Sequence, residues 1–578
     1  MRIHVALAQA GLSVDIKNEK NPIPGVWSVH LTEKTTGIYT NGKGATRLAA
    51  IASAYGEFCE RLGTGYFFAT LCTGSFRPKL TDGTALAWVF DPAESWHSNP
   101  EDMLNTGLWK LYDPDNAFRA KYRENPRVLD VLNDAHTGGM PRPDFAPEGI
   151  CCLPFLPLPV DHTAAKGTGV LFPLNLIWNL YASNGLSAGN SPLEVRVQAL
   201  SEIMERHVKY RIIAESICLP DIPASYFPAG VRASITAMET MGYRVLAKDA
   251  SLGGQYPVIA VALIMPASGE VLLSFGAHPC FDVAFERTVI ELLQGRALEY
   301  TGEFTAPNRD EEMTSEPVNL ESHFINSTGL VPSRFFAEQP DYPFTPWTAS
   351  ETREAEYTLL LDILERDGMS AYIRERSFMG LHVCQILVPG MSEIYPFEEL
   401  WEQNTSRYHA FRSLLTRTDS LSKREILALA ALAEEEFSSP NNGQSLLELL
   451  GIDAAGAAFW DAITVGELLA LVKLQSGDQD EVREFLHYVL DWDAVRPIKR
   501  AFWRAVADLL ETPNQSLSDT IFPRVLYETK QLDAAIEAMK GWPHSLFPAL
   551  GDDFSNAVAQ GRLLALYESY CRLLAAIP

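Results

Sequence analysis

The stretch that decides the fold runs from Asn184 to Lys209 and reads NGLSAGNSPLEVRVQALSEIMERHVK. It opens with a turn-forming run of Gly, Ser and Asn, and it then becomes a strong helix. Ser191-Pro192 marks the start of the helix, because proline at the first helical position loses no needed N–H. At about 100° per residue, one helix face collects polar side chains, namely Glu194, Gln198, Ser201, Glu202, Glu205 and Lys209. Such a face, headed by a Ser/Asn loop, can hold hard cations and phosphate oxygens. The alternative is the solvated face of an amphipathic helix.

The same pattern occurs earlier in the chain. Residues 57–61 (EFCER) repeat the pattern of residues 202–206 (EIMER), and Ser53 precedes the first motif as Gln198 precedes the second. A third predicted helix carries a polar stripe at i, i+4 and i+7, made of Arg287, Glu291 and Gln294. Three such stripes favour one shared polar site over three separate solvated surfaces.

Length and composition restrict the class of protein. The 578 residues suffice for two or more domains and a sizeable core. A formal net charge of -26 argues against nucleic acid as a direct partner and fits either a basic protein partner or plain solubility. No stretch reads as a signal peptide or a membrane span. The eight cysteines have no C-x-x-C spacing, which predicts reduced core residues in a cytoplasmic protein.

The chain before the central stretch mixes strand, loop and helix signals. We interpret Lys17 to Gly25 as a linker, followed by strands at Val26–Leu31 and Gly37–Thr40. The run Gly37 to Gly44 (GIYTNGKG) nearly matches a phosphate-binding loop, but glycine stands where Ser or Thr would ligate magnesium. We therefore interpret this run as a glycine turn that leads into the Glu57 helix. Residues from about 80 to 160 are rich in proline and are interpreted as an ordered connecting loop.

The sequence after residue 160 predicts further strands and helices, and beyond about residue 405 it predicts only helices. We expect a buried strand over 169–180, a hairpin of strands 258–265 and 270–276, a helix from about 281, a surface loop over 302–322, a helix over 351–366, and strands near 371–374 and 382–387. His207 and His278 could act as bases, but lone histidines near apolar neighbours are more often structural. Beyond about residue 405 only helical patterns follow, and Gly477-Asp478 between the patterns 465–475 and 480–490 is typical of helix-hairpin repeats. The prediction is an α/β (mixed α+β) domain over 1–404 and an all-helical, TPR-like domain over 405–578 for oligomerisation or partner docking.

Together these spaced motifs resemble the YcaO family over roughly residues 20 to 400. The resemblance rests on Gly42-Lys43-Gly44-Ala45-Thr46 with Ser53, Glu57, Glu60 and Arg61; Ser187-Ala188-Gly189-Asn190 with Glu194, Gln198, Glu202, Glu205 and Arg206; Arg287, Glu291 and Gln294; and Val388-Pro389-Gly390. It implies a core of mixed sheets with packed helices and an ATP site without a standard phosphate loop. It also implies that ATP, with Mg2+, activates a peptide backbone amide in the better-known members.

The resemblance also implies roles for individual residues. The implied metal ligands are Glu57, Glu60, Glu202, Glu205 and Glu291. The implied ATP-binding residues are Ser53, Ser187, Asn190, Glu194, Gln198, Arg206 and Arg287, and the implied catalytic residues are Glu202, Glu205, Arg206 and Arg287. Elementary electrostatics agrees, because glutamates crowded this closely repel and do not all stay ionised unless cations neutralise them.

The helical tail resembles the family branch that acts as an accessory factor for methylthiolation of a small-subunit ribosomal protein. That branch implies the ribosomal protein, its radical-SAM methylthiotransferase or both as partners, and a cytoplasmic homodimer. Azoline-forming members end in a proline-rich tail, whereas this chain ends LLAAIP. The start looks short, because relatives carry a further N-terminal segment with phosphate contacts. Two alternatives stay open: an azoline-forming cyclodehydratase, and a helical scaffold with a vestigial ATP site, against which the intact Glu and Arg stripes speak.

Overall fold

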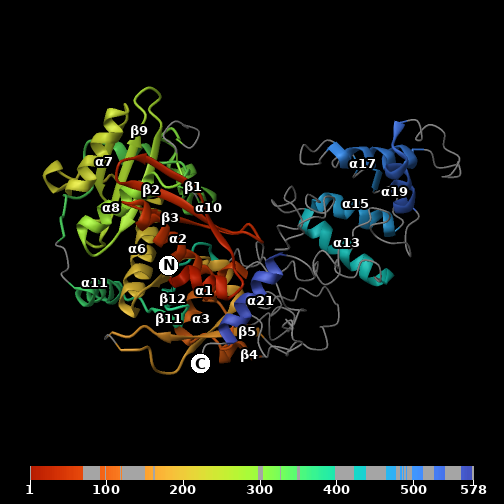
Figure 1. Cartoon of the computed structure of the whole chain (residues 1–578), viewed down its shortest axis with the longest axis horizontal. Coiled ribbons are helices and arrows are strands. Elements are labelled where there is room, and N and C mark those ends of the chain that lie inside the picture. The colour runs from red at the N-terminus through yellow and green to blue at the C-terminus, as the bar shows by residue number, and fades with distance from the viewer. Residues whose placement is uncertain are drawn as a thin grey trace.

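The structure, a computed structural model, is a mixed α/β fold of antiparallel sheets and packed helices (Figure 1). It describes residues 2–68, 91–97, 99–116, 119, 150–160, 163–296, 304–325, 327–347, 352–397, 422–437, 464–476, 482–483, 486, 490, 497–511, 526–539 and 562–575. Among these residues, no helix is long and apolar enough to cross a membrane.

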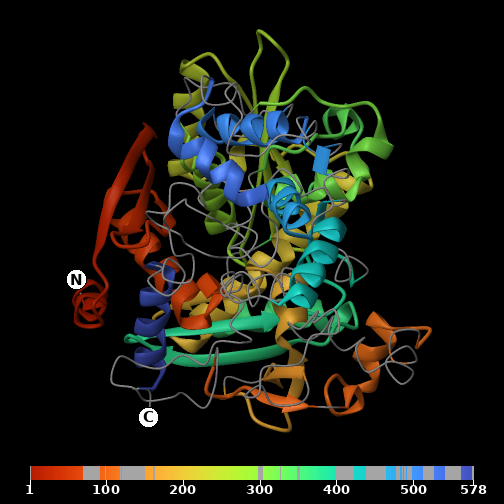
Figure 2. The same cartoon turned by 90° about the vertical axis from the view of Figure 1, so that its right-hand side faces the viewer.

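The first sheet has the order β1-β2-β3, with β1 (Val14–Ile23), β2 (Val26–Glu33) and β3 (Tyr39–Gly44), and it follows helix α1 (Arg2–Gln9). In Figure 2 these strands (red) stand at one edge of the molecule. The predicted linker over 17–25 is wrong, because most of it is strand. Pro22 is tolerated there since β1 is an edge strand whose pairing with β2 shifts register twice.

Strand β3 leads directly into helix α2 (Arg47–Thr64), whose N-terminus is capped by the Thr46 side chain. The predicted glycine turn over residues 37–44 is wrong in its second half, since Gly42 and Gly44 lie on β3. A Cβ on Gly42 would lie 2.0 Å from the carbonyl oxygen of Ala50. These glycines therefore serve close packing of the strand against α2 instead of a phosphate loop.

The second sheet has the order β10-β9-β8 and is covered on both faces. Its strands are β8 (Arg244–Asp249), β9 (Val258–Ile264) and β10 (Val271–Ala277), so the predicted hairpin is confirmed. Alternate residues of β9 pack toward α6 (Pro192–Ala214) on one face and toward α7 (Ala229–Thr240) and α8 (Phe281–Leu292) on the other. The sheet thereby holds the second and third polar stripes at a fixed separation.

The third sheet has the order β4-β5-β11-β12-β7, with β6 added beside β5. Its strands are β4 (Ser95–His97), β5 (Ile150–Pro157), β6 (Val170–Pro173), β7 (Leu186–Gly189), β11 (Tyr372–Phe378) and β12 (Leu381–Leu387). The predicted connecting loop over 80–160 is therefore wrong where β4, β5 and helix α3 (Thr106–Tyr112) form. The predicted helix over 351–366 is confirmed as α11 (Arg353–Arg366), and the strands predicted near 371–374 and 382–387 are confirmed as β11 and β12.

Two further predictions are wrong. The strand expected over 169–180 ends at Pro173, and the apolar run continues as α5 (Leu174–Leu176) and the π-helical turn η4 (Ile177–Tyr181), because an apolar run alone does not separate a buried strand from a buried helix. The loop expected over 302–322 contains α9 (Glu311–Ser315) and α10 (Pro317–Ile325). The described residues also contain the short 3-10 turns η1 (Tyr66–Phe68), η2 (Pro100–Asp102), η5 (Ala224–Tyr226) and η6 (Ser333–Phe336).

The described tail is helical, as predicted, with α13 (Lys423–Phe437), α15 (Val465–Ser476), α17 (Pro497–Leu510), α19 (Thr529–Met539) and α21 (Arg562–Ala575). The TPR-like organisation stays a prediction, and Gly477-Asp478 and the boundary at 404/405 lie outside the described residues. In Figure 1 the first four helices lie to one side, whereas α21 lies against the main body. There Tyr567 and Tyr570 join the core around α2, with ring centroids 5.1 and 5.0 Å from Phe68.

Candidate active site

Helix α6 begins where the sequence predicts. Ser191 caps it by accepting a hydrogen bond from the backbone N–H of Glu194 at 3.2 Å, and Pro192 occupies the first turn. Helices α2 and α6 both pack against β7 and β12, so the two Glu-x-x-Glu-Arg motifs rest on the same strands. Helix α8 packs on β9 and β10 and also touches β3.

Each motif arginine pairs with glutamates of its own helix. Arg61 lies 3.6 Å from the carboxylates of both Glu57 and Glu60, and Arg206 lies 2.6 Å from Glu202. The side chains in these pairs are 15 to 30% exposed, which leaves their charges partly accessible to dissolved ions.

The carboxylates of α2 and α6 act on one another. Burial raises the pKa of Glu60 to about 8, and burial also raises the pKa of Glu57 and of Glu205. The charge of Glu202 raises the pKa of Glu57 and Glu60 further. The acidic faces of the two helices therefore lie within electrostatic reach, and a bound cation would favour the ionised carboxylates.

The third polar stripe, on α8, and strand β3 contribute charged residues to the same cluster. Burial lowers the pKa of Arg287 on α8, while the negative charges of Glu205 and Glu202 oppose that shift. Glu291 of α8 forms an ion pair with Lys43 of β3. The structure thus brings the three predicted stripes together around Lys43, a residue that the sequence analysis quoted but gave no role in the site.

Other predicted residues lie at the edge of this cluster. Asn190 donates its backbone N–H at 3.0 Å and its side-chain amide at 3.3 Å to the carboxylate of Glu194, so these two side chains are engaged with each other. Ser53 and Gln198 are partly exposed on α2 and α6. Ser187 is fully buried on β7.

The residues fit ATP and Mg2+. Four polar atoms near the motifs are buried without a hydrogen-bond partner: Arg61 Nη1, Ser187 Oγ, Ser201 Oγ and Gln294 Oε1. The guanidinium and hydroxyl groups suit phosphate oxygens, and carboxylate oxygens are the ligands that Mg2+ prefers. Within the described residues, no three acidic, His or Cys side chains already surround one point as metal ligands do. The glutamates would therefore have to turn from their basic partners to bind a metal.

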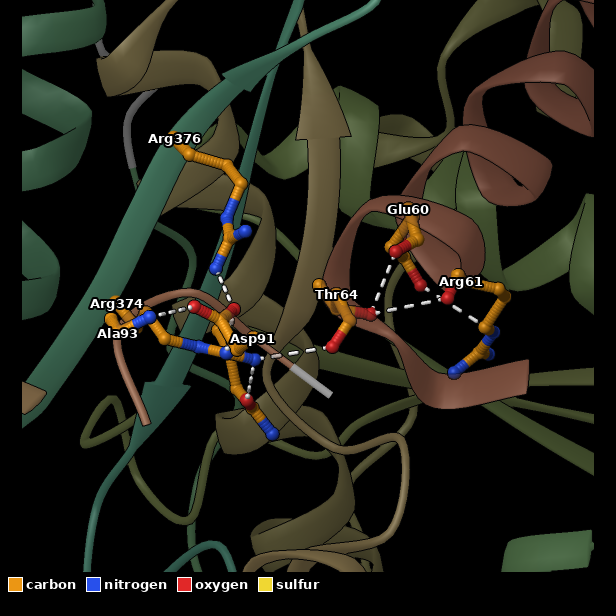
Figure 3. Close-up of polar contacts among 8 residues, drawn as sticks. Glu60, Arg61, Thr64, Asp91, Ala93, Arg374 and Arg376 are labelled. Carbon is orange, nitrogen blue, oxygen red and sulfur yellow. Dashed lines mark hydrogen bonds and ion pairs between the residues drawn. The ribbon is translucent and has the colours of Figure 1, made fainter. Parts of the chain in front are cut away.

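The last turn of α2 is fixed from outside the helix (Figure 3). Thr64 donates its hydroxyl to the carbonyl of Glu60 at 2.7 Å, and Arg374 of β11 donates to the carbonyl of Thr64 at 3.1 Å. Asp91 accepts from Arg374 at 2.8 Å and also pairs with Arg376. This buried network ties the turn that carries Glu60 and Arg61 to β11.

Arg206 has a separate support. Asn184 is 1% exposed, and its amide oxygen accepts from Arg206 Nη1 at 3.1 Å while its amide nitrogen donates to the carbonyl of Ser392 at 2.8 Å. The Ser392 hydroxyl in turn accepts from the N–H of Val388 at 2.8 Å. Asn184 was not predicted as a site residue, although it opens the turn before the motif and the Val388-Pro389-Gly390 run carried the resemblance.

The histidines behave as structural residues. His278 is 1% exposed, its Nδ1 accepts from the N–H of Cys280 at 2.9 Å, and burial lowers its pKa to about 3. Burial also lowers the pKa of His207. The described cysteines are free thiols, as the reduced-core prediction requires.

A scan against protein-family models matches residues 41–392 to the YcaO cyclodehydratase model, described as ATP- and Mg2+-binding, and residues 409–574 to the YcaO cyclodehydratase C-terminal domain. The chain therefore belongs to the YcaO family, and ATP and Mg2+ are its cofactors. It is 39% identical over 597 residues to the ribosomal protein S12 methylthiotransferase accessory factor YcaO of Escherichia coli, covering 100% of this chain and 96% of that protein. It is 34% identical over 577 residues to an uncharacterized protein of Haemophilus influenzae, covering 97% and 94%.

Solved structures are more distant. A heterocyclase in complex with substrate and cofactor matches at 16% identity and a TM-score of 0.43, over 68% of this chain and 52% of that one. This chain thus spans about half of that heterocyclase. YcaO from Methanopyrus kandleri bound with AMPPCP and Mg2+ matches at 17% identity and a TM-score of 0.40, over 68% and 89%.

Proposed function

We propose that this chain uses ATP and Mg2+ to assist the methylthiotransferase that modifies ribosomal protein S12. The observation that carries the proposal is the 39% identity to the Escherichia coli accessory factor along the whole of this chain. The meeting of the Glu and Arg stripes supports the ATP-dependent part, because a scaffold alone has no need to crowd like charges.

The residues divide the work as follows. Glu57, Glu60, Glu202, Glu205 and Glu291 would hold Mg2+, which would supply positive charge to neutralise the triphosphate. Arg61, Arg206 and Arg287 would hold phosphate oxygens, and the Ser187 hydroxyl would donate to them. The Thr64 network and Asn184 keep the two motif arginines in place.

The partner is proposed to be basic. A net charge of -26 attracts a basic ribosomal protein, while the arginines and Mg2+ reverse the sign locally at the nucleotide. We propose that residues 405–578 contribute to partner docking or to a homodimer. Association with S12 or its methylthiotransferase should slow several-fold between roughly 0.05 and 0.5 M salt, as the screening length shrinks. No detectable association at low salt would leave plain solubility as the reason for the charge.

The direct test is complementation. The chain would be expressed in an Escherichia coli strain that lacks its own accessory factor, and the methylthiolated fraction of S12 would be measured by mass spectrometry. We expect the wild-type chain and Glu215→Gln, an exposed glutamate at the end of α6, to restore modification. Glu205→Gln should restore little S12 modification, because it removes the carboxylate of one proposed Mg2+ ligand while leaving the fold intact. Full restoration by Glu205→Gln, with unchanged nucleotide affinity, would refute the ATP-dependent role.

The azoline-forming alternative predicts a different product. A cyclodehydratase removes water from a Cys-, Ser- or Thr-containing peptide while it consumes ATP. The same purified protein would be incubated with ATP and S12 or candidate peptides, and both the nucleotide products and the peptide masses would be measured. Loss of water from a peptide would favour this alternative over the accessory role.

A further inference from the structure

Lys43 forms an ion pair that joins two elements far apart in the sequence. It lies on β3, and its partner Glu291 lies on α8. The two side chains are 35% and 38% exposed. The pair is therefore open to dissolved ions, unlike a fully buried structural ion pair.

Lys43 also interacts electrostatically with the other glutamates of the cluster. Beyond its ion pair with Glu291, the negative charges of Glu205, Glu57 and Glu202 lie within electrostatic reach of its ammonium group. Arg61 and Arg206 pair within their own helices, but Lys43 reaches the cluster from outside. It is thus a positive charge that pairs with Glu291 of α8 and lies within electrostatic reach of glutamates on α2 and α6.

The backbone of Lys43 is fixed, while its side chain can move. A Cβ on either neighbouring glycine would collide with α2, since that of Gly42 would lie 2.0 Å from Ala50 and that of Gly44 would lie 2.7 Å from Ala49. A lysine ammonium is a compact charge on a flexible four-carbon stem. The strand therefore anchors a cation that can leave one partner for another by side-chain rotation alone.

We propose that Lys43 is an exchangeable counter-ion, which neutralises Glu291 and the neighbouring glutamates until Mg2+ takes that role and then turns to the nucleotide phosphates. The proposal rests on the ATP and Mg2+ binding of this family and is independent of the role proposed in S12 modification. The ammonium and Mg2+ compete for the same carboxylate oxygens, so Lys43 weakens the binding of Mg2+ alone. A bound nucleotide offers the displaced ammonium an anionic partner. Lys43 therefore couples Mg2+ binding to nucleotide binding.

The test uses the EDTA-treated full-length chain and two variants, Lys43→Met and Lys34→Met. Lys34 is a control from the same part of the fold, because it comes directly after β2 of the first sheet. It pairs with Asp15 at the surface, both side chains being 49% exposed. Thermal unfolding would be followed while Mg2+ is added with or without AMPPCP. The measured quantity is the half-saturating Mg2+ concentration, that is, the apparent Kd obtained by fitting the logarithmic rise of melting temperature with Mg2+ concentration.

We expect Lys43→Met to melt below Lys34→Met in EDTA, because its glutamates lose a counter-ion. Without nucleotide its half-saturating Mg2+ concentration should fall about three- to fivefold, the size of a partly exposed ion pair. With AMPPCP, Lys43→Met should no longer bind Mg2+ more tightly than wild type, because the variant lacks the ammonium group that would assist the phosphates. Lys34→Met should behave as wild type in both titrations.

Two outcomes would overturn the proposal in distinguishable ways. If wild type and Lys43→Met respond to Mg2+ and AMPPCP identically, Lys43 is only a structural partner of Glu291. If even wild type responds to neither ligand, the metal-nucleotide site itself fails, and this inference fails with it. Should Lys43→Met not fold, Lys43→Arg provides the comparison: its forked guanidinium should hold the carboxylates more firmly and raise the half-saturating Mg2+ concentration. An unchanged value in Lys43→Arg would count against exchange.

Discussion

Helices α2 and α6 carry the same Glu-x-x-Glu-Arg motif in different surroundings. Arg206 lies 2.6 Å from Glu202 and donates a hydrogen bond to the amide oxygen of Asn184 at 3.1 Å. Arg61 lies 3.6 Å from each of its two glutamates, and its Nη1 is buried without a hydrogen-bond partner. The guanidinium of Arg206 is therefore held in place by Asn184, whereas the guanidinium of Arg61 keeps a donor for a phosphate oxygen.

The two motif arginines lie equally close to an aromatic ring, but their helices end in different surroundings. Arg61 lies 4.7 Å from the ring centroid of Tyr66, and Arg206 lies 4.7 Å from that of Phe324. Helix α2 ends against α21: its C-cap Gly65 has a φ of 79°, and a Cβ there would lie 2.8 Å from the Tyr570 hydroxyl. Helix α6 ends beside Arg334, which donates to the carbonyl of Ser216 at 2.7 Å. The comparison shows that neighbouring elements, and not the motif, decide how firmly each arginine is held.

The largest expected effect comes from Tyr570, which supports the α2 side alone. Tyr570→Ala should lower the free energy of unfolding by about 3–5 kcal/mol, because Tyr570 is 1% exposed and packs on Phe68. Nucleotide affinity should fall with it. Urea unfolding and AMPPCP titration would measure both, with Tyr226→Ala, 45% exposed, as a control of small effect. A change as small as that of the control would mean that α21 does not support α2.

Asn184→Ala tests the α6 side. It should cost about 2 kcal/mol of stability, because a hydrogen bond to a charged group is lost and the Ser392 carbonyl loses its donor. Asn184→Asp should keep an acceptor for Arg206 but place a carboxylate against that carbonyl. Wild-type AMPPCP affinity in both variants would show that Arg206 needs no support.

The pH dependence separates the two motifs through Glu60. Its pKa of about 8 in the folded protein lies above the ordinary value of 4.5. The stability that this proton contributes is fully present below about pH 4.5 and is lost as pH rises toward 8, by up to about 1.4 kcal/mol per pH unit. Mg2+ must displace the proton, so Mg2+ affinity should rise with pH over the same window. Thermal unfolding in EDTA and Mg2+ titrations at several pH values would measure both trends. Glu60→Gln should reduce them, while Glu57 and Glu205, whose pKa values burial also raises, contribute the remainder.

The smallest expected effect concerns the rings beside the two arginines. Tyr66→Leu and Phe324→Leu should each cost about 0.5–1 kcal/mol of cation–π interaction. Tyr66→Leu should lower AMPPCP affinity more, since Arg61 has fewer other supports. A larger loss of AMPPCP affinity in Phe324→Leu would mean that Arg206, and not Arg61, depends more on its aromatic neighbour.

Predictions from the sequence succeeded where short-range periodicity carries the information. The polar stripes on α2, α6 and α8, the start of α6 at Ser191-Pro192 and the β9–β10 hairpin all depend on neighbours within a few residues. They failed where partners are distant. Residues 17–25 form a strand because β2 pairs with them, and the apolar run after Val170 becomes helical after four residues because its surroundings in the core bury it in that form.

The sequence by itself determined which side chains share a helix face, because a helix turns by a fixed angle per residue. It thereby specified the glutamates and arginines of the polar stripes, whose motifs indicated the family. Only the tertiary structure decided which charges meet. Lys43 lies beside Glu291, Asn184 beside Arg206 and Tyr570 beside Gly65, each pair joined across long stretches of chain. Such pairings arise when sheets and helices pack, and no local pattern in the sequence records them.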